Sequence, residues 1–185
     1  RPAIAVGTDL LFAAVTKLSA AWRHQRMGNV DWPILRWLAS GSLPGAATVL
    51  LWLYIAEPDT ELVSWYVRKG LAVTLVVSAA AILAFPVLKR WQPQRFEAPI
   101  TQTPLRRLPT ILFGLILGAA VALTSVGAGA IGVAALTGLY PHMLARRVVG
   151  TDIVHAVPLT FVAGLGHAGM GNIDPMLLGA LLCGS

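Results

Sequence analysis

Long stretches without a charged residue dominate the hydrophobic pattern of this chain. Four runs contain no Lys, Arg, Asp or Glu: residues 37–56, 71–88, 108–145 and 153–173. A membrane-spanning helix needs about 20 apolar residues, so three runs match one crossing and the run over 108–145 is nearly twice that length. A soluble helix would show a polar face every turn, which these runs lack. The pattern predicts an all-α integral membrane protein, a polytopic helical bundle.

Composition and charge agree with this class. Hydrophobic residues make up 56% of the 185 residues and charged residues 12%, whereas an ordinary soluble domain has roughly 25% charged residues. The formal net charge of +6 is compatible with nucleic-acid binding. However, the basic residues lie in short loops between apolar runs, as the positive-inside rule requires. We therefore expect a lipid bilayer as partner, no nucleic acid, and a multi-pass location in the cell (inner) membrane.

The chain contains an internal repeat. Residues 6–42 and 149–185 align without a gap and agree at 15 of 37 positions, as a comparison of the two printed segments shows. The shared residues are polar and small ones, which apolar helices would not share by chance: "GTD", a His, "MGN" and an Asp. Such self-similarity indicates two related halves.

The repeat predicts the domain organisation. Residues 1–88 form a first repeat that lacks its beginning, 89–107 a basic cytoplasmic loop, and 108–185 a second repeat that is cut short, so we expect an internal fragment of a longer protein. Within the first repeat we expect helices over residues 2–22, over 32–54 with an interruption at "GSLPG", and from residue 63 or 71 to residue 88.

The run over residues 108–145 has two interpretations. The small residues of "TSVGAGAIG" can simply permit close helix packing. Alternatively, the segment is broken at Ser125–Gly129 into two half-helices, which membranes tolerate where the free backbone lines a cavity. The first repeat carries Arg23 and Arg26 where the second has Gly166 and Gly169. Charge bias then favours inverted repeats and a re-entrant segment.

Several motifs resemble a known family. "LTSVGAGAIGVAAL", "RRVVGTDIVHAVPLT" and "GHAGMGNID" are similar to the second half of TauE/SafE-type permeases, the sulfite exporter family. "AVGTDLLFAAVTKLSAAWRH", "GNVDW" and "GSLPG" resemble its first half. The resemblance covers nearly the whole chain except the central basic loop and its flanking helix. It implies an inner-membrane transporter of small sulfur-containing anions such as sulfite or sulfonates.

The matched residues include candidates for substrate binding. A small oxyanion needs hydrogen-bond donors and positive potential without a fixed full charge, which the N-terminus of a half-helix supplies. Hydroxyls and glycines at the break have suitable chemistry, and a threonine stands at the equivalent point of each repeat. The predicted substrate-binding residues are Thr124, Ser125, Gly127, Gly129, Thr8 and Thr151. The alternative for Thr8 and Thr151 is an N-cap of the following helix.

Asp9 and Asp152 are candidates for proton coupling. Ionisable groups inside membrane helices are costly and mark pathways or relays. His155 lies three residues after Asp152 and therefore on the same helical face. The alternatives are a carboxylate that complements a helix dipole and a histidine that only packs. Lys17 can pair with Asp9 or extend to the membrane surface.

Other functions are less consistent with the sequence. His24 and His167 lack the spacing of a metal site, and helix termination by glycine in "MGN" accounts for their surroundings. We expect no metal, no cofactor and no catalytic residues, because no nucleophile with its base can be assembled. The alternatives to a permease are an intramembrane enzyme, which rarely needs two similar halves, and a membrane scaffold subunit, which would not require an embedded Asp in both repeats.

Overall fold

The computed structural model describes the backbone of residues 2–56, 59–90, 106–127 and 129–185. In these ranges all regular secondary structure is helical, which confirms the predicted class. Five segments of the described chain are long and apolar enough to cross a membrane: α1, α2, residues 61–84 of α3, α4 and α6. The helices are α1 (Pro2–Arg26), α2 (Trp32–Ala56), α3 (Thr60–Arg90), α4 (Arg107–Thr124), α5 (Ala130–Leu139), α6 (Ala145–Gly169) and α7 (Pro175–Cys183).

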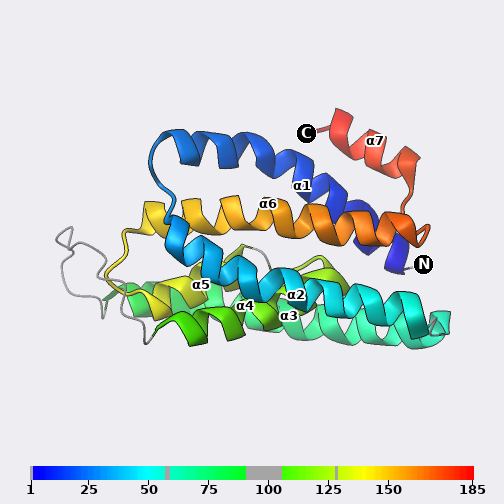
Figure 1. Ribbon diagram of the computed structural model, residues 1–185, viewed down its shortest axis with the longest axis horizontal. Coiled ribbons are helices and arrows are strands. Elements are labelled where there is room, and N and C mark those ends of the chain that lie inside the picture. Colours follow the sequence, from blue (N-terminus) through cyan, green and yellow to red (C-terminus); the bar gives the residue numbers. More distant parts are fainter. Residues whose placement is uncertain (1, 57–58, 91–105, 128) are drawn as a thin grey trace.

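Helices α1 and α6 lie side by side and run in opposite directions (Figure 1). Gly7 near the start of α1 packs against Asn172 in the turn after α6, and Gly150 near the start of α6 packs against Asn29 in the turn after α1. Between them, Gly164 contacts Leu11. The repeated motifs are therefore related by an inversion, as the charge comparison predicts.

The two turns have the same backbone structure. Gly28 and Gly171 adopt positive φ values of 67° and 73°. The next residue returns a hydrogen bond to the last helical turn, from the Asn29 amide to the His24 carbonyl at 3.0 Å and from the Asn172 amide to the His167 carbonyl at 2.9 Å. This is a Schellman motif, in which glycine avoids the strain of a left-handed residue. The predicted helix termination by glycine is confirmed.

Hydrogen bonds join each repeat to the turn of the other. Thr8 Oγ1 accepts a bond from the Asp174 amide at 3.0 Å, and Thr151 Oγ1 accepts one from the Asp31 amide at 2.9 Å. Both threonines are fully buried. Neither is an N-cap, because α1 begins at Pro2 and α6 is preceded by Leu144. The N-cap alternative for these threonines is wrong. We call the Thr8–Asp174 and Thr151–Asp31 hydrogen bonds the cross-repeat contacts.

Helix α2 continues through "GSLPG" without the predicted interruption. The single helix spans residues 32–56 and includes Pro44. Its glycines serve packing: a Cβ on Gly41 or Gly45 would overlap backbone carbonyls of α4, and one on Gly114 or Gly118 would overlap carbonyls of α2. Two glycines four residues apart on each helix thus permit close backbone approach. The predicted interruption is wrong because this glycine pair is a helix-packing surface.

Helices α4 and α5 form a re-entrant hairpin. The chain leaves α4 at Thr124, and α5 returns over ten residues, about 15 Å, which is too short to cross a bilayer. Arg106 before α4 donates to the Leu139 carbonyl at the end of α5, and the hydroxyls of Thr110 and Tyr140 lie 2.7 Å apart. The predicted break and the return of the chain are confirmed, but α4 is long enough to cross a membrane, so only α5 is a half-helix.

Basic residues of four helices lie at one end of the bundle (Figure 1). α1 ends there, and α2, α4 and α6 begin there. We call this the basic end, and its residues are Arg23, Arg26, Arg36, Arg106, Arg107, Arg146 and Arg147. The basic loop predicted over 89–107 falls largely on residues 91–105, which lie outside the described residues. Its margins are helical, since α3 extends to Arg90 and α4 begins at Arg107.

Candidate functional site

The break between α4 and α5 has an unusual backbone. Ser125 has a φ of 61°, Gly127 of 126° and Gly129 of 146°. These values suit glycine, and a serine there is uncommon. Thr124 donates to the Ala120 carbonyl at 2.7 Å, and its hydroxyl oxygen lies 3.2 Å from the Val126 amide. Of the predicted residues, Thr124 ends α4, and Ser125, Gly127 and Gly129 lie in the non-helical residues between α4 and α5, with Ala128 outside the described residues.

Helix α5 begins directly after this stretch. Its first intrahelical bond runs from the Val133 amide to the Gly129 carbonyl at 2.8 Å. The amides of residues 130–132 precede that bond, so they carry the partial positive charge of a helix N-terminus.

Asp9 of the first repeat borders one side of the break. Ser125 Oγ donates a hydrogen bond to Asp9 Oδ2. The contact joins residues 116 positions apart in the sequence. The serine hydroxyl and the carboxylate, predicted separately for substrate and proton binding, are therefore direct neighbours.

Asp152 of the second repeat borders the other side. Its carboxylate packs against the first turn of α5, where a Cβ on Gly132 would overlap Asp152 Oδ1. Asp152 is 2% exposed, and its Oδ1 has no hydrogen-bond partner among the described residues. The aspartates of both Gly-Thr-Asp motifs therefore flank one break, which the repeat alone did not indicate.

Lys17 and His155 complete the polar cluster. Lys17 on α1 acts electrostatically on Asp152 and on Asp9, in that order of strength. The sequence suggested a pairing with Asp9 only. His155 is 1% exposed and shares the inner face of α6 with Asp152. An ammonium group and an imidazole thus accompany the two carboxylates that border the break, inside the predicted membrane region.

Sequence reasoning missed Ser42. Its Oγ lies 2.7 Å from His155 Nε2, and both side chains are buried. The available signal was the Gly-Ser pair that ends each copy of the repeat, Gly41-Ser42 and Gly184-Ser185. His167, predicted only as part of a turn, also reaches this region, with Nε2 at 2.8 Å from the Ala122 carbonyl near the end of α4.

Thr8 and Thr151 do not join this cluster. Their hydroxyl oxygens are acceptors in the cross-repeat contacts, near the starts of α1 and α6. The structure gives them a role in holding the two repeats together.

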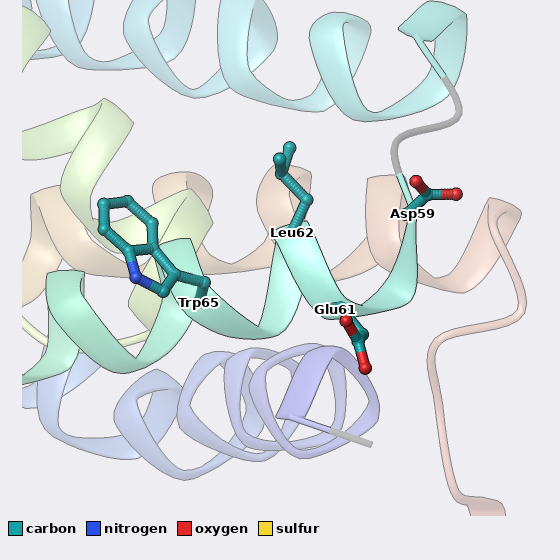
Figure 2. A pocket seen from close by; sticks show the side chains of 4 residues that line it. All are labelled: Asp59, Glu61, Leu62 and Trp65. Atoms are coloured by element: carbon teal, nitrogen blue, oxygen red, sulfur yellow. The ribbon is translucent and has the colours of Figure 1, made fainter.

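The remaining features do not suggest another site. Among the described residues, no group of three or more His, Cys, Asp or Glu could hold a metal ion. An open depression at the start of α3 is lined by Asp59, Glu61, Leu62 and Trp65 (Figure 2). Its two carboxylates disfavour an anion, and none of the predicted site residues lines it.

Comparison with known proteins agrees with the geometry. The family model described as "Sulfite exporter TauE/SafE" matches residues 1–185. The curated protein "Probable membrane transporter protein YjnA" of Bacillus subtilis (strain 168) is 34% identical over 185 residues, which cover 100% of this chain and 72% of that protein. No solved structure matches the chain. The interpretation as an intramembrane enzyme is excluded by this relationship, and the chain belongs to the sulfite exporter TauE/SafE family of membrane transporters.

Proposed function

We propose that this chain moves small sulfur-containing oxyanions, sulfite first among them, and that protons accompany the anion. One observation carries the proposal: a broken re-entrant segment is flanked by the aspartates of both inverted repeats. Broken helices between inverted repeats are where secondary transporters bind substrate and coupling ions. The family description, which names sulfite export, supplies the substrate class.

The break offers suitable donors for an oxyanion. The first-turn amides of α5 supply hydrogen bonds and partial positive charge. The Ser125 hydroxyl donates to Asp9 while that carboxylate is ionised, and it can donate to the anion once Asp9 is protonated. These donors bring no fixed full charge, so the anion can leave again. We assign substrate binding to Thr124, Ser125, Gly127 and Gly129. We assign Thr8 and Thr151 a structural role, because their hydroxyls form the cross-repeat contacts between α1 and α6.

The flanking carboxylates explain why protons are needed. Asp9 and Asp152 repel an anion at the break while they are ionised, and Lys17 can offset only one negative charge. Protonation of a carboxylate removes that repulsion and makes it a hydrogen-bond donor. Binding of the anion and uptake of a proton therefore favour each other. Asp152, His155 and Asp9 are the groups to which we assign this proton.

Transport of radiolabelled sulfite into proteoliposomes tests the proposal. We expect uptake that an imposed pH gradient drives, that a sulfonate inhibits, and that chloride inhibits weakly. Ser125→Ala should lower uptake about tenfold, since a hydrogen bond to a charged group is worth about 1.5–3 kcal/mol. Ser40→Ala is the matched control, because Ser40 is exposed and bonds only within its own helix turn to Trp37. Wild-type protein that moves neither sulfite nor a sulfonate would refute the substrate class.

A further inference from the structure

A buried hydroxyl of the first repeat contacts the imidazole of the second. Ser42 Oγ on α2 lies 2.7 Å from His155 Nε2 on α6, with the side chains 0% and 1% exposed. We propose that Ser42 is a positioning residue of the proton pathway. It fixes the His155 ring and keeps Nε2 hydrogen-bonded whether the ring is neutral or protonated. This inference rests on the proposed function and deepens its proton-coupling step.

The backbone that carries Ser42 is held firmly. Gly114 on α4 packs against the Ser42 amide, and Gly118 packs against the Ser42 carbonyl. Any side chain at either glycine would collide with the α2 backbone. The close packing of α2 and α4 therefore sets the position from which the hydroxyl reaches His155.

The choice of serine follows from the chemistry of a ring that changes its protonation state. A hydroxyl rotates and can either donate to a bare Nε2 or accept from an Nε2–H group. An aliphatic side chain can do neither, and a buried polar atom without a partner is costly. Ser42 thus permits His155 to gain and lose a proton without breaking the contact between α2 and α6.

The other ring nitrogen is available for the proton. His155 Nδ1 and Asp152 Oδ1 are both buried and both lack a hydrogen-bond partner among the described residues. They lie three residues apart on one face of α6. When a proton leaves the Asp152 carboxyl and joins His155 Nδ1, the products are a carboxylate and an imidazolium. Because Nδ1 is bare before this transfer, the neutral ring carries its proton on Nε2, so Ser42 accepts from Nε2–H both before and after the step, and no further reactant is required.

The charges that face His155 come from a small set of groups. Lys17 on α1 acts electrostatically on both His155 and Asp152. α5 contains no ionisable side chain. The charged residues of α2 and α4, Arg36 and Arg107, lie toward the basic end. A change in titration after substitution of Ser42 therefore reports on its contact with the ring.

The first experiment measures sulfite uptake by proteoliposomes over a range of external pH. Ser42→Ala removes a hydrogen bond that is stronger to the protonated ring than to the neutral ring, so the midpoint of the profile should move down by about half to one pH unit. Ser42→Thr, which keeps the hydroxyl, should restore the wild-type midpoint. Ser40→Ala, on the exposed side of the same helix, should leave it unchanged. A midpoint in folded Ser42→Ala equal to that of Ser40→Ala would overturn the inference.

The second experiment does not depend on transport. Nitrogen-15 spectra of histidine-labelled protein report the protonation of each ring nitrogen, and His155→Gln identifies the resonances of His155. We expect the Nε2 resonance to shift in Ser42→Ala and to stay in place in Ser40→Ala, whereas an unchanged resonance would contradict the proposed contact. Absence of sulfite uptake by the wild-type protein would contradict the proposed function, and these spectra would still decide the role of Ser42.

Discussion

Two aspartates at matching positions of the repeat have different surroundings. Asp9 is exposed and accepts a hydrogen bond from Ser125, whereas Asp152 is buried beside Gly132 and His155. Asp152 Oδ1 has no hydrogen-bond partner among the described residues, and an ionised oxygen in that state is costly to bury. Of the two, Asp152 therefore gains more from taking up a proton, and we treat it as the main proton-carrying group of the cluster.

Replacement of Asp152 by Asn separates the two possible roles of this residue. Asn keeps the shape and most hydrogen bonding but cannot titrate. We expect sulfite accumulation driven by a pH gradient to fall at least about tenfold, as for loss of one essential proton carrier. Exchange of internal for external sulfite should persist, because no carboxylate remains to repel the anion. Both fluxes can be measured in the same proteoliposomes.

Asp174→Asn is the matched control for that experiment. The Asp174 side chain caps α7 by accepting from the amides of Met176 and Leu177, and Asn is an equally good cap. Transport should be unaffected. An Asp152→Asn protein that still accumulates sulfite in response to pH would exclude the relay.

Gly132 determines how closely the Asp152 carboxylate approaches α5. Gly132→Ala places a methyl group where Asp152 Oδ1 lies, so the carboxylate must move away from the break. We expect sulfite uptake to fall about tenfold, which corresponds to about 1.4 kcal/mol of lost interaction when the carboxylate is displaced. The protein should still insert into the membrane. Gly138→Ala on the same helix meets open space and should retain uptake. Equal uptake by the two variants would place the functional carboxylate elsewhere.

At the scale of helices, the two repeats hold each other through equivalent contacts. Each Gly-Thr pair packs against the turn that follows α1 or α6 in the opposite repeat, and the two threonine bonds differ by 0.1 Å in length, 3.0 Å against 2.9 Å. The predicted inversion made such a pairing possible, but no sequence signal connects Thr8 with a residue 166 positions away. The N-cap alternative failed because α6 begins at Ala145, within the basic stretch that precedes the apolar run.

Valine at either threonine should weaken this association. Thr8→Val and Thr151→Val keep the shape of the side chain but leave a backbone amide of the opposite turn unpaired. Each should lower the free energy of unfolding by about 1–3 kcal/mol. Thr48→Val is the control, because the exposed Thr48 hydroxyl bonds only to Pro44 of its own helix. Denaturation in detergent measures all three, and a loss no larger than that of Thr48→Val would contradict the structural role.

At the scale of the whole molecule, the sequence predicted the features that follow from local chemistry. The cluster of small residues at 125–129 indicated the break, and the arginines missing at Gly166 and Gly169 indicated the inversion. Ser42 was missed because its partner His155 lies 113 positions away, and such neighbours follow only from the packed structure. The same limit applied to "GSLPG", whose glycines face α4 and do not interrupt α2.

The arrangement also predicts which end faces the cytoplasm. The basic end should be cytoplasmic by the positive-inside rule, so the turn at Met27 lies inside and the turn at Met170 outside. Cysteines at Met27 and Met170 are preferable to ones at Gly28 and Gly171, whose positive φ disfavours any side chain. The exposed Cys183 must first be replaced by Ser.

In intact cells, a membrane-impermeant maleimide should then label Met170→Cys but not Met27→Cys until the membrane is opened. The two positions match in the repeat alignment, so each serves as the control for the other. Opposite labelling is required because α1 and α6 run antiparallel with their terminal turns at opposite ends of the bundle. Labelling of both cysteines from the same side would contradict the inverted arrangement in the membrane. Labelling of Met27→Cys alone would keep the inversion and reverse the orientation that the arginines predict.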